Sequence, residues 1–209
     1  HHVTRTAELG SYARKIYDAL EEDFVAELAT GSINVANALV KLLRLAQVTG
    51  GTLAPDEGPA ETIDTAKEDL LIEALKETEE PVVVFARFRA DLDAVHRAAK
   101  AAGLKSLEHS GRDHEGLACW QGGEGTVLAL QIQAGGEGID LTRAAIAIYY
   151  SVGFSLGDYE QSLARVHRPG QKRPVTYLHL QVANSVDEKI YKALRARKEV
   201  VAAVMEAMR

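Results

Sequence analysis

The chain has 209 residues, of which 46% are hydrophobic and 26% charged, enough for a substantial core in one large domain or in one domain with a helical annex. Its formal net charge is −6, whereas a dedicated nucleic-acid-binding domain is usually basic, so any such contact must come from a local patch or from parts of the protein outside this chain. A single cysteine, Cys119, excludes an internal disulfide and fits a reducing compartment, and no secretory signal or membrane-spanning run is visible, so we expect a cytoplasmic protein.

The first 62 residues predict a helical annex. His1 and His2 are interpreted as the remnant of a purification tag, not as metal ligands. Apolar residues four apart predict an amphipathic helix from Tyr12 to Ala29, and a leucine-rich helix follows from Asn34 to Val48. A loop rich in proline and glycine, Thr52 to Glu61, then separates the annex from the rest of the chain.

Residues 63–209 predict an α/β body in which helices and strands alternate. The continuous apolar run from Val82 to Ala86 suits a strand that is buried on both faces of a parallel sheet. Further strands are expected at Leu104–His109, Thr126–Gln133, Ala144–Val152 and Val175–Val182, and helices at Thr65–Thr78, Arg89–Ala102, His114–Trp120, Leu156–Arg168 and Ser185–Met208. This alternation predicts a doubly wound parallel sheet flanked by helices.

One of these helices, Leu156 to Arg168, carries a glutamine and two arginines. At about 100° per residue, Gln161, Arg165 and Arg168 share one face, and Pro169 ends the helix. Guanidinium groups aimed at one place bind phosphate oxygens and can stabilise charge on a γ-phosphate. An isolated Arg-x-x-Arg would more simply be a solvated surface pair.

A glycine turn strengthens the phosphate interpretation. Gly135, Gly136 and Gly138 follow the strand Thr126–Gln133 and let the backbone approach a ligand at the carboxyl end of that strand, where open α/β sheets bind ligands. The turn is not a dinucleotide fingerprint, because Leu141 stands where the third glycine would be.

In this order, AGGEGIDLT, an apolar strand and QSLARVHRPGQ resemble motifs V and VI of the superfamily-two helicase-like ATPases of the Swi/Snf type. VVVFARFRADLDAV resembles the family's motif IV, HSGRD the loop after it, and PVTYLHLQVANSVDEKIYKAL the closing strand and helix. The resemblance runs from Pro81 to Leu194 and is looser before that. It implies a P-loop NTPase-like fold, the second RecA-like lobe of such an enzyme, in a compact form similar to bacterial or phage members.

The resemblance also implies roles for individual residues. Arg165 and Arg168 match the motif VI arginines that reach the γ-phosphate of ATP, and Gln161 helps to shape the cleft. Gly138 approaches the nucleotide, and Asp140 stands where relatives contact the ribose, although Swi/Snf members more often have asparagine there. The residues implied to face nucleic acid are Arg87, Gln131, Gln133, Gly135 and Gly136.

The sequence contains no phosphate-cradling G-x-x-x-x-G-K-Ser/Thr loop and no acidic magnesium residue after a strand. We therefore interpret the chain as the carboxyl-terminal half of a DNA-dependent ATPase and translocase that is inactive alone. Its expected partners are an N-terminal RecA-like lobe of the same polypeptide, which would hold ATP and Mg²⁺, and duplex DNA. Two alternatives stay open: a non-catalytic interaction module that keeps the RecA-like fold, and a strand-separating or restriction-type motor.

Overall fold

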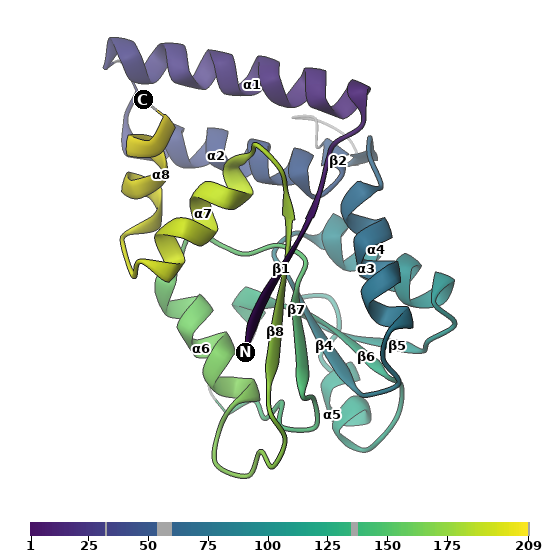
Figure 1. Cartoon of the computed structure of the whole chain (residues 1–209). Helices are drawn as coiled ribbons and strands as arrows, with labels where there is room; N and C mark the ends of the chain where they lie inside the picture. The colour runs from purple at the N-terminus through teal and green to yellow at the C-terminus, as the bar shows by residue number, and fades with distance from the viewer. Residues whose placement is uncertain (32, 54–59, 135–137, 209) are drawn as a thin grey trace. The chain divides into compact units, whose positions relative to one another are not determined.

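The computed structural model describes residues 1–31, 33–53, 60–134 and 138–208 (Figure 1). The chain divides into two compact units: the first comprises His1–Arg5, Glu68–Gly153 and Gly157–Leu180, and the second comprises Thr6–Lys67, Phe154–Leu156 and Gln181–Arg209. Within the described ranges, no helix combines the length and hydropathy that crossing a membrane requires.

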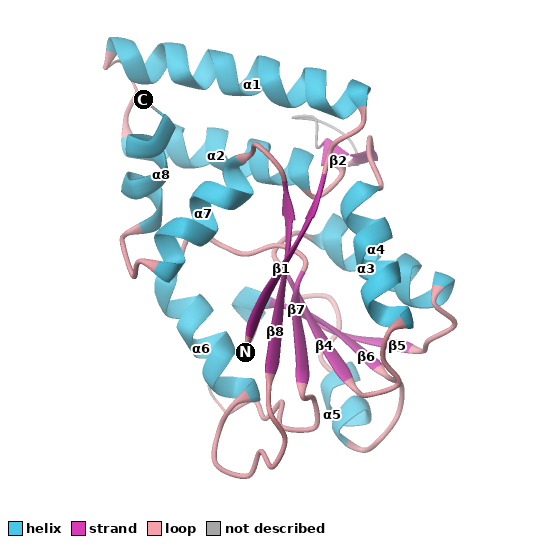
Figure 2. Cartoon of the chain, in the orientation of Figure 1, coloured by secondary structure: helices cyan, strands magenta, loops and turns pink. Residues whose placement is uncertain are grey.

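A parallel sheet of six strands is the framework of the first unit, with the order β1-β8-β7-β4-β6-β5. Every pairing among its five later strands is parallel (Figure 2). The strands are β1 (His2–Ala7), β4 (Val82–Ala86), β5 (Ser106–His109), β6 (Val127–Gln131), β7 (Ile146–Tyr149) and β8 (Thr176–Val182). The predicted α/β fold with a RecA-like sheet is confirmed.

The core on one face of the sheet lies under α3 (Ala66–Lys76) and α4 (Arg89–Ala101). Strand β4 is buried along its whole length, as its continuous apolar run predicts. Every second residue of β4 packs with the inner side chains of the two helices, which include Leu71, Leu75, Leu92, Val95 and Ala98. Each large apolar side chain removed from water in this way contributes about 1.5–3 kcal/mol.

The opposite face carries α6 (Leu156–Val166), and α5 (Gly116–Gln121) follows β5. Successive side chains of a strand point to opposite faces, so Tyr149 lies on the face away from Ile148 and its helices. Its hydroxyl lies 2.6 Å from Ser162 Oγ of α6, and its ring stacks on Phe85 at 4.9 Å.

Helices from both ends of the chain form the second unit. They are α1 (Ser11–Thr30), α2 (Val35–Thr49), α7 (Val186–Arg195) and α8 (Val200–Met208), with a short hairpin of β2 (Thr52–Leu53) and β3 (Glu61–Thr62). Buried Asp187 ties α7 to the end of α2, since its carboxylate accepts from Thr49 Oγ1 at 2.8 Å. The same carboxylate accepts from Lys67 Nζ at 2.5 Å and Val182 N at 3.0 Å. The closing helices, predicted to belong to the 63–209 body, therefore group with the annex helices.

Several predicted elements need correction. The single closing helix Ser185–Met208 is wrong, because the chain turns after Ala196 and Arg197 adopts a left-handed φ of 52°. The predicted loop Thr52–Glu61 contributes β2 and the first residue of β3 at its ends, and residues 54–59 lie outside the described residues. The strand predicted to reach Gln133 ends at Gln131, where a 3₁₀ turn, Ile132–Ala134, begins.

Strand β1 was not predicted, and it contains part of the segment interpreted as a tag remnant. The His1 ammonium donates to the Val175 carbonyl at 2.7 Å, and Tyr177 N donates to the His1 carbonyl at 2.8 Å. The His2 ring stacks on Tyr177 at 4.9 Å. Figure 1 shows β1 beside β8 at the edge of the sheet. The tag interpretation itself stays a prediction.

Candidate functional site

The carboxyl ends of β4, β5 and β6 meet at one edge of the sheet, where Gln131 links them. Its side-chain Nε2 donates to the Arg87 carbonyl at 3.2 Å, and its Oε1 accepts from Gly111 N at 3.3 Å. Gln131, predicted to face nucleic acid, thus uses both ends of its amide to join the segments after β4 and β5.

Arg87 follows β4 and is held in place from several sides. Its backbone N–H donates to Ser151 Oγ at 2.8 Å, and Ser151 in turn donates to the buried carboxylate of Asp91 at 2.5 Å. The guanidinium lies over the Phe88 ring, 5.7 Å from its centroid. Burial lowers the pKa of Arg87, while the charges of Asp158 and Asp91 act in the opposite direction. An arginine remains charged under these conditions, so Arg87 is a positioned cation at this edge.

Tyrosine hydroxyls fix α6 to the sheet. Besides the Tyr149–Ser162 bond, Tyr159 of α6 lies 2.9 Å from His179 Nε2 of β8, and Tyr177 of β8 donates to the Leu163 carbonyl at 2.9 Å. Burial holds the pKa of Tyr149 well above its ordinary value, so this hydroxyl keeps its proton. These bonds fix which face of α6 turns toward the edge of the sheet.

That face brings two of the predicted site residues together. Gln161 and Arg165, with Asp158 one turn before them, line one cavity whose wall includes Phe85 of β4 and Leu130 of β6. Ile139 and Leu141, from the segment after the glycine turn, complete the wall. The cavity therefore brings together side chains of α6, the strand ends and residues 139–141.

Arg168 does not lie on the helix, which ends at Val166 because the residue before a proline is pushed away from helical geometry. It remains near the glycine segment, since its guanidinium donates to the Ile139 carbonyl at 3.4 Å. Leu141 N also donates to the Arg165 carbonyl at 3.1 Å. The two arginines are thus both tied to residues 139–141, Arg165 by its backbone and Arg168 by its side chain.

Only part of the glycine segment falls within the described residues. Gly135 and Gly136 lie outside them, and Gly138 has a φ of +94°, which favours glycine. Asp140 accepts from Thr142 N at 2.8 Å and from Thr142 Oγ1 at 2.7 Å. These bonds, together with the charge of Arg168, hold the pKa of Asp140 below its ordinary value. Gln133 is exposed on the 3₁₀ turn.

Gln171 is a positioning residue that the sequence did not identify. Its amide donates to the carbonyls of Ala144 at 2.8 Å and Thr142 at 3.1 Å, and accepts from Arg173 N at 3.1 Å. It thereby joins the segment after α6 to the segment before β7. The only signal in the sequence is an amide directly after Pro-Gly, which does not reveal its distant partners.

The loop after β5 is held by a second unforeseen group, buried Glu108. Its carboxylate accepts from Ser110 Oγ at 2.5 Å and from Arg112 Nε at 2.7 Å, and His96 Nε2 lies 2.9 Å away. Burial alone would raise its pKa, but these hydrogen bonds lower it to about 2. Gly116 packs against the same strand so closely that a Cβ would lie 2.0 Å from the Glu108 carbonyl oxygen.

A family model for the helicase conserved C-terminal domain matches residues 66–170, which include the cavity, both arginines and the glycine segment. The chain belongs to this family. Within it, the chain resembles carboxyl-terminal RecA-like lobes of the Swi2/Snf2 kind, the resemblance that the motif order predicts. The family match spans half of the 209 residues.

Relatives of this helicase lobe include viral, bacterial and eukaryotic proteins. It is 26% identical to protein p41 of Acyrthosiphon pisum secondary endosymbiont phage 1, across all of this chain and 46% of that protein. It is 25% identical to an ATP-dependent helicase of Mycoplasma genitalium, across 93% of this chain and 20% of that protein. It is 29% identical to the chromatin-remodeling ATPase INO80 of Mycosarcoma maydis, across 65% of this chain and 7% of that protein. The chain thus spans less than half the length of each.

Solved structures share the fold of the helicase lobe. The C-terminal part of the Fun30 ATPase domain superimposes with a TM-score of 0.76 at 16% identity, covering 100% of this chain and 97% of that one. The Sulfolobus solfataricus SWI2/SNF2 ATPase core in complex with dsDNA gives a TM-score of 0.72 at 19% identity, covering 99% of this chain and 47% of that one.

Proposed function

We propose that this helicase lobe is the carboxyl-terminal half of a DNA-dependent ATPase that translocates on duplex DNA. The observation that carries the proposal is the placement of Gln161 and Arg165 in one cavity with the carboxyl ends of β4 and β6. In open α/β sheets, ligands bind at that edge. The family match and the ATP-dependent helicases among the relatives support ATP use, and the dsDNA bound to the similar Sulfolobus ATPase core supports a duplex partner.

In this proposal, Arg165 and Arg168 reach across to an ATP molecule that is held mainly by an N-terminal lobe of the same polypeptide. Planar guanidinium groups bind phosphate oxygens through paired N–H donors and stabilise charge that develops on the γ-phosphate. Both arginines are tied to residues 139–141, so movement of that segment and movement of the arginines would be linked. Gln161 would shape the cleft beside them.

The guanidinium and amide donors at this edge fit phosphate oxygens, and the carboxylate of Asp158 lines the same cavity. ATP would supply the phosphoanhydride bond whose hydrolysis drives translocation. The other lobe would hold Mg²⁺ with the nucleotide, and this chain alone would not hydrolyse ATP. Gly138 would allow close backbone approach, and Asp140 would contact the ribose through acceptor sites that its bonds to Thr142 leave unused.

Arg87 is the side chain proposed to face the DNA backbone, and Gln131, Gln133, Gly135 and Gly136 are proposed to share this role. Gln131 would act mainly by holding the Arg87 carbonyl, because its amide already bonds within the protein. Replacing Arg87 with alanine in the full-length protein should weaken binding to duplexes of any sequence and reduce the salt slope by about one. Unchanged affinity and slope would contradict this role.

The arginine assignment is tested by Arg165→Ala and Arg168→Ala in the full-length protein. We expect each variant to lose DNA-stimulated hydrolysis by about 10³-fold or more, as for other arginines that act on transferred phosphoryl groups. Arg195→Ala is a matched control, because Arg195 is an exposed arginine of α7 that does not line the cavity. Turnover retained in both cavity variants would refute the assignment.

A further inference from the structure

The α7–α8 region of the second unit carries a concentration of positive charge. The window from Lys189 to Lys198 contains five lysines and arginines and no acidic residue, with Glu188 and Glu199 directly flanking it, although the whole chain has a net charge of −6. Such a local excess attracts an anionic partner even on an acidic protein.

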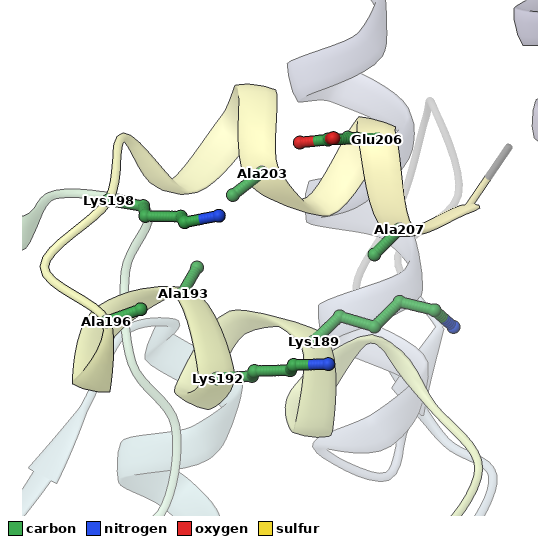
Figure 3. Close-up of a pocket in the computed structure, with 8 residues that line it drawn as sticks. All are labelled: Lys189, Lys192, Ala193, Ala196, Lys198, Ala203, Glu206 and Ala207. Carbon is green, nitrogen blue, oxygen red and sulfur yellow. The ribbon is translucent and has the colours of Figure 1, made fainter.

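Part of this charge lines a groove of about 350 Å³ between the two helices. Figure 3 shows its lining. Ala193 of α7 and Ala203 of α8 face one another across it, and the Lys198 and Glu206 side chains extend toward each other from opposite ends. Ala196 and Ala207 add to the small apolar surface, so the groove offers methyl groups with lysines around them.

The corner that shapes the groove is well defined. Lys198 N donates to the Ala193 carbonyl and Arg197 N to the Leu194 carbonyl, both at 3.0 Å, which is the Schellman arrangement at a helix end. Glu199 then caps α8 by accepting from Val201 N at 3.2 Å and Ala202 N at 2.6 Å. A groove held open in this way loses little entropy when a ligand binds.

Two of the three lysines in the groove are available to a partner. Lys189 pairs with Glu21 of α1 at 3.1 Å. Lys192 and Lys198 are exposed and make no ion pair or side-chain hydrogen bond with any residue that the structure describes. Exposed lysines without a partner are common, but these two converge on one concave apolar surface.

We propose that the α7–α8 groove binds an acidic polypeptide segment in which small apolar side chains alternate with carboxylates. The carboxylates would pair with Lys192 and Lys198, and the small side chains would fill the space between the alanines. A phosphodiester backbone fits less well, because it has no apolar side chain to bury against the alanine surface. The inference concerns a surface of the second unit and does not depend on the ATPase proposal.

The probe is a fluorescein-labelled peptide of about 15 residues built from Glu-Ala-Ala repeats, long enough to span α7 as a helix. Its neutral counterpart has glutamine in place of glutamate, and a labelled duplex of about 20 base pairs represents nucleic acid. Fluorescence anisotropy with the 209-residue chain should show saturable binding of the acidic peptide that weakens as salt is raised. The neutral peptide should bind about tenfold more weakly or not at all.

Lys192→Ala combined with Lys198→Ala should weaken acidic-peptide binding about tenfold. The matched control, Lys76→Ala with Lys100→Ala, removes two exposed lysines of the first unit. This double variant should leave acidic-peptide binding unchanged. Ala203→Leu should also weaken acidic-peptide binding, because the larger side chain fills the groove. If charge alone attracted the peptide, this substitution would not change the affinity. Helical circular dichroism verifies that each variant is folded.

Three results would overturn the proposal. The first is no saturable binding of the acidic peptide to the wild-type chain, and the second is equal binding by the wild-type chain and the double lysine variant. The third is duplex binding that depends on Lys192 and Lys198 while peptide binding does not, which would make the groove a nucleic-acid surface.

Discussion

Glu108 shows how one buried carboxylate can hold a loop at the functional edge. It accepts hydrogen bonds from Ser110 and Arg112, and His96 lies within bonding distance, so residues 110–112 are fixed beside Gln131. Arg112 also pairs with Asp93 at 2.6 Å. A buried charge with this many partners stabilises the fold only while it remains ionised.

The pH dependence follows from the pKa of about 2. The pKa of a glutamate in the unfolded chain is about 4.3. The contribution of Glu108 to the free energy of unfolding is therefore complete above that pH, and it is lost as the pH falls toward 2. Glu108→Gln should therefore lower the free energy of unfolding by roughly 2 kcal/mol at pH 7, and the difference from wild type should shrink below about pH 4. Urea unfolding at several pH values measures both effects.

Glu124→Gln is the control for this series, because Glu124 is exposed and its pair with Lys105 lies in solvent. It should change stability little at any pH. A Glu108 difference that stays constant down to pH 3 would show that ionisation of this carboxylate is not what stabilises the loop.

At the scale of elements, the sequence predicts most of the sheet because its strands are buried apolar runs. Strand β4 has the predicted bounds, Val82–Ala86. It is buried on both faces, so each of its residues is apolar and the run is visible in the sequence. Strand β1 escapes prediction, because HVTRTA is only half-buried and pairs with β8, about 175 residues away. The motif order likewise predicts Gln161 and Arg165 at one site. It does not reveal the bonds of Tyr149 and Gln171, whose partners lie 13 to 29 residues away. Glu108 escapes prediction because nothing in the sequence shows that this carboxylate is buried beside Ser110 and Arg112.

The break between α7 and α8 was missed for a related reason. Where a helix ends in a left-handed residue, that residue is usually glycine, but here Arg197 takes the left-handed position. Arg197→Gly should raise the free energy of unfolding by about 0.5–1 kcal/mol, because glycine adopts this conformation without steric cost. Arg197→Ala is the control, because alanine removes the arginine side chain but keeps the steric cost of the left-handed backbone. It should not raise the free energy of unfolding. Thermal or urea unfolding that shows no gain for glycine over alanine would contradict the backbone explanation.

For the whole molecule, the comparisons place the chain in a helicase family, while its length covers less than half of each of three relatives. The family model spans both arginines, residues 139–141 and the strands whose ends form the sheet edge, which the structure brings together. The sequence contains no phosphate-cradling loop. The proposed ATPase activity therefore requires a second lobe that supplies this loop.

The most direct test of this account is ATP hydrolysis by the full-length protein, measured with and without duplex DNA, beside the 209-residue chain alone. We predict hydrolysis by the full-length protein only, with stimulation by duplex DNA. Hydrolysis by the separate chain, or no hydrolysis by the full-length protein with any nucleic acid, would contradict it.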